Sequence, residues 1–260
     1  MNFGRCLWKS TPALTLLFTT ISVCLCAPPP EFSNSESALE SVARSSGTLQ
    51  RNSTSIINVL TFGASGDGIS DDTAAFTAAL AFLFAQRGGV LYVPAGAYRI
   101  TSTLMVPSAG AFTIQGDGWV SNMIWSTASN LFQWPSSTTA SNMLIQDIMI
   151  SVPSSWGPSE TPLFAFSFPG GLTQSLIRHI KIENPAYKGF GVSGIDMGLV
   201  SDTNEVVSCV LWLLTGIGIR IGKGSEIRVR GGRVISLGAL ESPAGAIGIH
   251  ITGNNGKLNF

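Results

Sequence analysis

The stretch from Ile57 to Ile100, INVLTFGASGDGISDDTAAFTAALAFLFAQRGGVLYVPAGAYRI, decides the fold. It reads as a short strand, a Gly/Asp loop, a helix, a Gly-Gly stop and a second strand that ends at a Pro/Gly turn. The helix is predicted over Asp71–Arg87, because the oxygens of Asp71 and Asp72 can accept the free N–H groups of a first turn. Gly88-Gly89 then ends it, since glycine turns the chain at positive φ.

Four large apolar side chains of this helix recur at spacings of three and four residues: Phe76, Leu80, Leu83 and Phe84. They therefore share one face. An apolar helix face followed by a run of short strands needs a surface to cover. The open end of a stack of strands, whose N–H and C=O groups would otherwise stay unpaired, provides one. The sequence thus predicts a capping helix.

The same stretch carries two longer motifs, N-V-x-x-F-G-A-x-G-D-G-x-x-D-D-T-A-A-F and G-G-x-L-Y-V-P-x-G-x-Y. Both resemble the entry segment of the pectate-lyase-like superfamily, the right-handed parallel β-helices that include rhamnogalacturonases, epimerase-like pectate lyases, polygalacturonases and some β-1,3-glucanases. The resemblance implies an all-β solenoid with an N-terminal capping helix. It says little about chemistry, because one fold hosts several functions. The matching residues are Asn58, Val59, Phe62, Gly63, Ala64, Gly66, Asp67, Gly68, Asp71, Asp72, Thr73, Gly89, Tyr92, Val93, Pro94, Gly96 and Tyr98.

The first 55 residues differ from the rest. Residues 1–26 have a basic start and an uncharged apolar run, which predicts a secretory signal peptide; an uncleaved anchor is the alternative. Residues 27–55 are rich in Pro, Ser, Glu and Asn and predict a disordered linker, with an N-glycosylation sequon at Asn52. We expect a secreted, extracellular protein without a membrane segment after cleavage. Its mature chain retains Cys209 alone, a buried filler.

The remaining chain, residues 56–260, predicts a single β-helix domain. The sequence as a whole is 45% hydrophobic and 12% charged, and its net charge of zero gives no indication of nucleic acid. Short β-branched runs alternate with Gly, Asn, Ser and Pro. Aligning Ile182, Trp212 and Val234 gives spacings of 30 and 22 residues, a loose solenoid repeat. The end at Phe260 has no capping element in the sequence, which favours a truncated product over capping by a second copy.

Three acids lie within ten residues of each other: Asp196, Asp202 and Glu205. If they converge at one edge of a coil, mutual repulsion would raise one pKa and suit acid catalysis; a solvated loop is the alternative. Polygalacturonase-like hydrolases carry N-T-D, D-D, G-H-G and R-I-K motifs. Here Asp202-Thr-Asn204 inverts the first motif, G-H-G is missing, and Arg220-Ile-Gly-Lys223 is one residue longer than R-I-K.

A lyase or epimerase needs a base, and a cation to neutralise the uronate carboxyl. Arg220 is the candidate catalytic cation, while Lys223, Arg228 and Arg230 are candidate substrate contacts; a solvated outer face is the alternative. Alternation places Arg220 and His250 on the outer side of their strands. The two histidines show no metal-ligand spacing, so we expect no metal site or cofactor, with Ca²⁺ as an option for a lyase.

The segment from Ile100 to Ile177 is rich in aromatic residues and contains no Lys or Arg. Trp134 and Trp156, both near proline, are candidates for stacking on sugar rings. Filling the coil interior is the alternative.

These patterns, with the resemblance, predict an enzyme that acts on a pectin-like or other extracellular polysaccharide, either as a hydrolase or as a lyase. The alternatives are a non-catalytic glycan-binding or adhesion solenoid, or an inactive fragment of a longer glucanase. The oligomeric state is left open.

Overall fold

The computed structural model describes residues 55–107, 110–153, 162–184, 191–236, 247–253 and 258–259. The predicted signal peptide, and the linker up to residue 54 with Asn52, lie outside the described residues, as does Trp156. All described residues belong to one compact unit, Asn52–Phe260. In the described part of the chain, no helix is long and apolar enough to cross a membrane.

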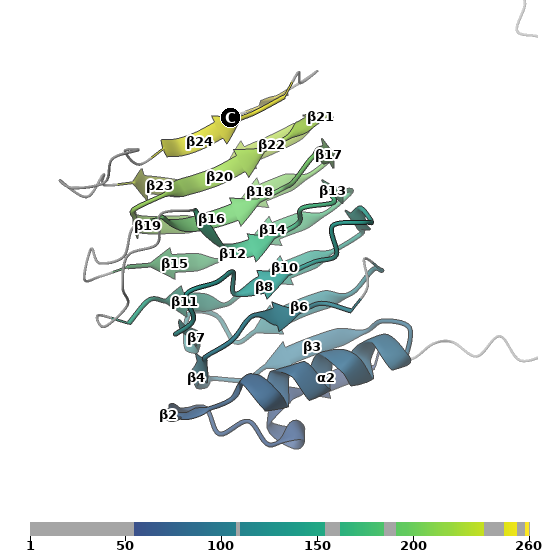
Figure 1. Cartoon of the computed structure of the whole chain (residues 1–260), viewed down its shortest axis with the longest axis vertical. Coiled ribbons are helices and arrows are strands. Elements are labelled where there is room, and N and C mark those ends of the chain that lie inside the picture. The colour runs from purple at the N-terminus through teal and green to yellow at the C-terminus, as the bar shows by residue number, and fades with distance from the viewer. Residues whose placement is uncertain are drawn as a thin grey trace, which may run out of the picture. The chain divides into compact units, whose positions relative to one another are not determined.

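The described chain is a right-handed parallel β-helix, as predicted. Four parallel sheets, A to D, run along it, and each complete coil passes through sheets C, D, A and B in turn. Figure 1 shows the successive strands stacked from β2 and β4 near one end to β24 near the other.

The strands of the two larger sheets have the following bounds. Sheet A comprises β1 (Ile56–Asn58), β3 (Val90–Val93), β6 (Thr113–Gly116), β10 (Leu144–Gln146), β14 (Leu176–Arg178), β18 (Glu205–Val207), β22 (Ile227–Arg230) and β25 (Leu258–Asn259). Sheet B comprises β2 (Asp67–Asp71), β4 (Gly96–Ile100), β7 (Ser121–Trp125), β11 (Met149–Ser151), β15 (Lys181–Glu183), β19 (Val210–Leu214) and β23 (Arg233–Ser236).

The two smaller sheets complete each coil. Sheet C comprises β5 (Leu104–Met105), β8 (Phe132–Gln133), β12 (Leu163–Ser167), β16 (Val192–Asp196), β20 (Ile217–Ile221) and β24 (Ile247–Ile251). Sheet D comprises β9 (Ala140–Ser141), β13 (Leu172–Thr173), β17 (Val200–Asp202) and β21 (Lys223–Ser225).

Helix α2 (Thr73–Ala85) lies across one end of the stack, next to the short 3₁₀ helix η1 (Val59–Phe62) (Figure 1). Its predicted face is correct: Phe76, Leu80 and Leu83 are buried, and Phe84 packs on Phe112. Its start is two residues later than predicted, because Asp71 still belongs to β2.

The two aspartates before α2 hold the loop together. Asp71 accepts hydrogen bonds from the hydroxyls of Thr73 and Thr101, and the bonds from Thr101 and then Thr73 lower its pKa. The buried Asp72 accepts from the backbone N–H groups of Ser65 and Gly66. The loop and the helix start are therefore tied together.

The interior consists of apolar columns that repeat once per coil, because parallel pairing places inward residues above one another. One example on each of three sheets shows this. Sheet A carries Ile57, Leu91, Ile114, Ile145, Ile177, Val206 and Val229; sheet B carries Tyr98, Met123, Ile150, Ile182, Leu211 and Val234; sheet C carries Leu104, Phe132, Phe166, Ile195, Ile219 and Ile249.

This register corrects the repeat alignment made from the sequence. Leu211, not Trp212, pairs with Ile182 and Val234. Trp212 pairs instead with Glu183 and is exposed. A shift of one residue reverses the face of a strand, and the alignment therefore places Trp212 on the wrong side.

Two corners of the coil are tight and turn on residues with left-handed backbone conformation. The corner from sheet D to sheet A uses Asn142, Gln174, Thr203 and Glu226, and the corner from sheet A to sheet B uses Asp147, His179, Ser208 and Gly231. A single αL residue reorients the chain sharply. The corner from sheet C to sheet D brings glycine close to the backbone of the preceding coil: a Cβ atom at Gly198 would overlap the carbonyl oxygen of Phe168.

Candidate functional site

The outer face of sheet C carries a column of residues that becomes polar and charged toward the C-terminal coils. Its residues pair in register across successive strands: Met105, Gln133, Ser167, Asp196, Arg220 and His250. Their chain neighbours on either side belong to the core on every strand from β5 to β20. Alternation along a strand therefore points this column away from the core.

Asp196 and Arg220 form the centre of this column. Asp196 Oδ1 accepts hydrogen bonds from Arg220 Nε at 2.8 Å and from the N–H of Gly198 at 2.9 Å, and Asp196 Oδ2 accepts from Arg220 Nη2. The Asp196 side chain is 1% exposed, whereas that of Arg220 is 37% exposed. A buried carboxylate needs such a partner, and the fork of a guanidinium matches its two oxygens.

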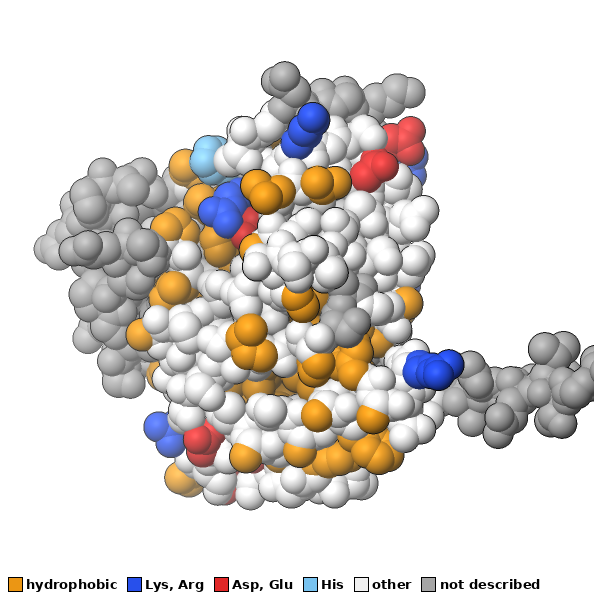
Figure 2. Space-filling model, turned by 45° about the vertical axis from the view of Figure 1, so that its right-hand side comes forward, with side chains coloured by type: hydrophobic (Ala, Val, Ile, Leu, Met, Phe, Trp, Pro, Cys, Tyr) orange, Lys and Arg blue, Asp and Glu red, His pale blue; other side chains and the backbone are white. Residues whose placement is uncertain are grey.

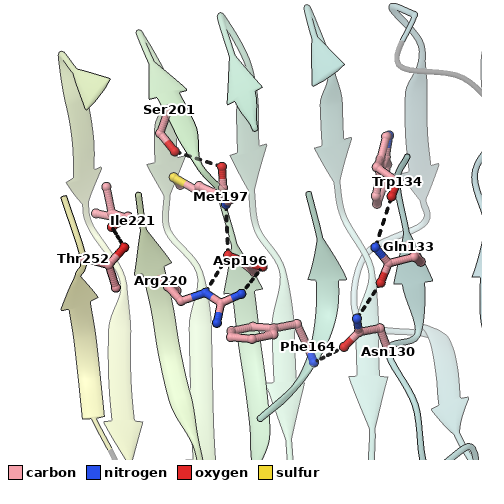
Figure 3. A network of polar contacts seen from close by, with 11 residues as sticks. Asn130, Gln133, Trp134, Phe164, Asp196, Met197, Ser201, Arg220, Ile221 and Thr252 are labelled. Atoms are coloured by element: carbon pink, nitrogen blue, oxygen red, sulfur yellow. Dashed lines mark hydrogen bonds and ion pairs between the residues drawn. The ribbon is translucent and has the colours of Figure 1, made fainter. Parts of the chain in front are cut away.

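The ring of Phe164 packs against this guanidinium. The guanidinium carbon of Arg220 lies 4.6 Å from the ring centroid, within the range of a cation–π interaction. Figure 3 shows Arg220 reaching between Asp196 and Phe164. Arg220 Nη1 makes no hydrogen bond with the residues that the structure describes, and so retains two N–H donors.

An amide chain extends from this cluster to the preceding coils. The backbone N–H of Phe164 donates to Asn130 Oδ1 at 2.7 Å, and Asn130 Nδ2 donates to Gln133 Oε1 at 2.6 Å. Gln133 Nε2 in turn donates to the carbonyl of Trp134 (Figure 3). These bonds hold the backbone at Phe164, and with it the ring under Arg220.

His250 pairs with Arg220 on the next coil. It is half-buried, and its Nδ1 atom is buried without a hydrogen-bond partner among the described residues. Imidazole is the side chain that exchanges a proton near neutral pH. Asp196, Arg220 and His250 thus place a carboxylate, a cation and an ionisable base on three consecutive coils.

A repeated triplet could have revealed this column in the sequence. Gly194-Ile-Asp196, Gly218-Ile-Arg220 and Gly248-Ile-His250 share one pattern and sit in register. The first two glycines are needed because a Cβ at Gly194 would overlap the carbonyl oxygen of Gly218, and one at Gly218 would overlap that of Gly248. Phe164, Gln133 and Asn130 have no comparable signal in the sequence.

The predicted convergence of three acids is wrong. Asp196 lies on sheet C, but Asp202 ends β17 on sheet D, where Ser225 Oγ donates to its Oδ1 atom. Glu205 begins β18 on sheet A and binds Arg228 and Arg230. Hydrogen bonds from Arg228 and Arg230 lower the pKa of Glu205. The chain turns a corner after each of the first two acids, so the three carboxylates lie on different sheets.

The predicted cationic substrate contacts are likewise spread around one coil. Lys223 lies on sheet D and is exposed. Arg228 and Arg230 share the outer face of β22, as predicted, but both are paired with Glu205 of the preceding coil. Figure 2 shows few charged side chains on the visible face, and several of the acidic groups lie next to a basic group. Each of these two arginines gives one N–H bond to Glu205, whereas Arg220 binds Asp196 through two nitrogens and leaves Nη1 unbonded among the described residues.

The prediction that Trp134 stacks on sugar is wrong. Its side chain is 1% exposed and its ring lies 4.1 Å from that of Phe168 in the core. The alternative of interior filling holds for Trp134. A further surface hollow, of about 590 Å³, lies over the corner between sheets D and A and is lined in part by Glu205, Glu226 and Arg228. Within the described residues, no three His, Cys, Asp or Glu side chains gather into a metal-binding group.

Comparisons with known proteins agree with the fold. Residues 56–161 match the family model described as Rhamnogalacturonase A/epimerase, pectate lyase-like. Residues 56–161 are thus similar to a pectate-lyase-like family, and the stacked parallel sheets of the described residues are those of a parallel β-helix.

Individual relatives match over only small parts of their own length. The chain is 48% identical over 63 residues to the mannuronan C5-epimerase AlgE5 of Azotobacter vinelandii, a match that covers 24% of this chain and 6% of that protein. It is 38% identical over 64 residues to the non-secreted LysM effector LysM19 of Penicillium expansum, or 25% of this chain and 5% of that protein. Among solved structures, the A-module of AlgE4 from A. vinelandii superposes with a TM-score of 0.42 at 16% identity, covering 77% of each chain.

Proposed function

We propose that this protein acts on an extracellular polysaccharide that carries uronate carboxylates, bound along the outer face of sheet C. The observation that carries the proposal is Nη1 of Arg220, which has no partner among the described residues and belongs to a guanidinium held in place by Asp196 and Phe164. Among the described residues, Nη1 keeps two N–H donors, and a charge-assisted hydrogen bond from it suits the carboxylate of a sugar acid. The names of the A. vinelandii relatives, mannuronan C5-epimerases, support the same substrate class.

The reaction proposed is proton abstraction at C5 of the uronate, the carbon beside the carboxylate. Arg220, whose charge is balanced by Asp196, donates hydrogen bonds from Nη1 to the uronate carboxylate, and these bonds stabilise the charge that develops when the C5 proton leaves. His250, on the next coil, accepts that proton at its imidazole. Cleavage of the C4–O4 bond then leaves a C4=C5 double bond, and the departing O4 oxygen takes a proton from water. Transfer of a proton from water to the opposite face of C5 gives the C5 epimer instead.

Hydrolysis by two carboxyl groups has less support. That chemistry needs a second carboxyl group about 5–10 Å from the first. On the described sheet C column, Asp196 is the one acidic side chain, and its two oxygens already accept three hydrogen bonds. We derive no step through Ca²⁺, because no cluster of three candidate protein ligands forms among the described residues.

The second candidate is a non-catalytic glycan-binding protein. The same saturation of Asp196 favours it, since a carboxylate fully engaged by Arg220 and Gly198 acts as a support rather than as a reagent. In that case Arg220 would hold a carboxylate without reaction. Secretion belongs to both candidates and is part of the proposal.

The test uses the chain from Ala27 onward with polymannuronate, polygalacturonate, rhamnogalacturonan and β-1,3-glucan, with Ca²⁺ or with a chelator. In D₂O, NMR follows deuterium entering C5, ultraviolet absorbance follows unsaturated uronides, and a reducing-end assay follows hydrolysis. We expect deuterium at C5 or unsaturated uronides with polymannuronate or polygalacturonate, and their loss in His250→Ala and Arg220→Lys.

Asp202→Asn is the matched control, because it removes a carboxylate charge on sheet D, away from the sheet C column. Equal turnover in wild type, His250→Ala and Arg220→Lys would overturn the site. Reducing ends without deuterium or double bonds would overturn the reaction class. Binding of polyuronate that depends on Arg220 without any turnover would establish the second candidate instead.

A further inference from the structure

Two tryptophans are exposed on the outer side of sheet B, away from the column just described. Trp119 precedes β7 and is 50% exposed; Trp212 lies on β19 and is 41% exposed. Between them lies Lys181 of β15, whose Nζ is 5.4 Å from the Trp119 ring centroid and 5.6 Å from that of Trp212. We call Trp119, Lys181, Glu183 and Trp212 the tryptophan–lysine surface.

The parts of this surface hold one another in place. Trp119 Nε1 donates a hydrogen bond to the carbonyl of His179. Lys181 Nζ forms an ion pair with Glu183 Oε2 at 2.6 Å, and Glu183 is the register partner of Trp212. The side chains of Lys181 and Glu183 are only 18% and 17% exposed. The indole rings are therefore held by their neighbours while their outer parts face solvent.

Single exposed apolar side chains are common on protein surfaces and need no explanation. Two tryptophans that flank one cation, one on sheet B and one in the turn before it, are different, because sites that bind partners are rich in tryptophan. A ring that is already fixed loses little entropy when a ligand stacks on it. This arrangement favours a ligand with flat apolar faces and polar edges.

Charge narrows the class of ligand. Lys181 is neutralised by Glu183, so the surface offers a donor and an acceptor but no net charge. The hydroxyl groups of a sugar can donate to Glu183 and accept from Lys181. A carboxylate ligand would instead be repelled by the Glu183 carboxylate beside the ammonium group. The C–H faces of sugar rings fit the indole faces.

We propose that the tryptophan–lysine surface is a binding site for a neutral glycan chain. It is separate from the uronate site on sheet C and does not depend on that function. A protein with both sites could bind a neutral polysaccharide on sheet B and an acidic polysaccharide on sheet C at the same time.

The test is titration of intrinsic fluorescence and heat with cellohexaose, laminarihexaose and xylohexaose. We expect binding of at least one of them, with Kd raised about tenfold or more by Trp119→Ala or Trp212→Ala, the effect of losing one stacked ring. Phe82→Ala is the matched control, because Phe82 is a similarly exposed ring on α2. Near-ultraviolet circular dichroism checks that each variant is folded. Trp212→Phe is a further control, since a smaller aromatic ring should retain part of the affinity.

Charge is tested separately with oligomannuronate and with salt. We expect neutral oligosaccharide binding that changes little between low and high salt, and Lys181→Met to weaken it. Tighter binding of oligomannuronate at this surface, steeply weakened by salt, would overturn the neutral class. Absence of binding to all three neutral hexaoses, or a Kd that stays unchanged when Trp119→Ala and Trp212→Ala are combined, would overturn the site. The uronate assay on sheet C stays unchanged in the Trp variants, so the two proposals fail independently.

Discussion

Arg220 lies one coil beyond Asp196 in the register of sheet C, and the guanidinium that binds this carboxylate also lies on the ring of Phe164. The carboxylate is buried and the guanidinium is partly exposed, so the buried charge depends on this one cation. Removing one partner should therefore cost more than removing both.

We expect Arg220→Met to lower the free energy of unfolding by about 1–3 kcal/mol, because it leaves the Asp196 carboxylate buried with one remaining donor. The double variant Asp196→Leu/Arg220→Met should recover part of that loss. Urea denaturation of wild type, both single variants and the double variant gives the coupling energy. A single variant as stable as wild type would contradict a structural role for this pair.

Glu205 makes the stability of the C-terminal coils depend on pH. Hydrogen bonds from Arg228, and then from Arg230, lower its pKa below the ordinary value of 4.5. Its contribution is thus fully present above pH 4.5 and is lost as pH falls through the lowered pKa of the folded state. We expect Glu205→Gln to cost less than about 1 kcal/mol at neutral pH, since the arginines are exposed, and nothing in strong acid.

The measurement is thermal unfolding of wild type and Glu205→Gln from neutral pH down to strong acid. The curves should converge at the acid end. A constant difference at every pH would mean that the glutamate acts through packing rather than through charge.

Asp72 should be the most sensitive acid of the loop before α2. Its side chain is 2% exposed and accepts the N–H groups of Ser65 and Gly66, which Asp72→Ala would leave without partners. We expect a loss of about 1–3 kcal/mol. Asp67→Ala, in the exposed part of the same loop, is the control and should cost less. Denaturant midpoints compare the two, and the reverse order would contradict the assigned role of Asp72.

Gly198 should tolerate no side chain. Its φ is +70°, and a Cβ atom would overlap the carbonyl oxygen of Phe168, so Gly198→Ala must push two coils apart. We expect a cost on the order of 3 kcal/mol. Gly118 has a φ of +89° with nothing near its Cβ position, and Gly118→Ala should cost about 1–2 kcal/mol through backbone strain alone. Denaturant unfolding compares the two variants. Similar losses of unfolding free energy would show that backbone strain, rather than the spacing of the coils, causes the loss at Gly198.

The segment from Ile57 to Ile100 was predictable because its signals are local. The face of Phe76, Leu80 and Leu83, the Gly88-Gly89 stop and the covered strand end all depend on residues close in sequence. The repeat of strands was predictable for the same reason, since each run of β-branched residues indicates a strand by itself.

The candidate site was only partly predictable, because its geometry depends on corners. Thr203 turns the chain in the left-handed region although nothing in its type requires it, and this turn separates Asp202 from Glu205. Trp134 was misplaced because proline beside it indicated a loop, while the side chain points into the core. The pairing of Asp196 with Arg220 follows from register, which the spacing of residues alone does not fix.

The corners also determine where this chain can vary in length. From β9 onward, the corners from D to A and from A to B each use at most two residues between strands, whereas the segments that join sheet B to sheet C are residues 152–162, 184–191, 215–216 and 237–246. Insertions at that edge leave every strand pairing intact, and this explains why the repeat is loose in sequence yet regular in space. A protein built in this way can exchange the segments that join sheet B to sheet C, and so alter the surface beside the proposed site, without refolding its scaffold.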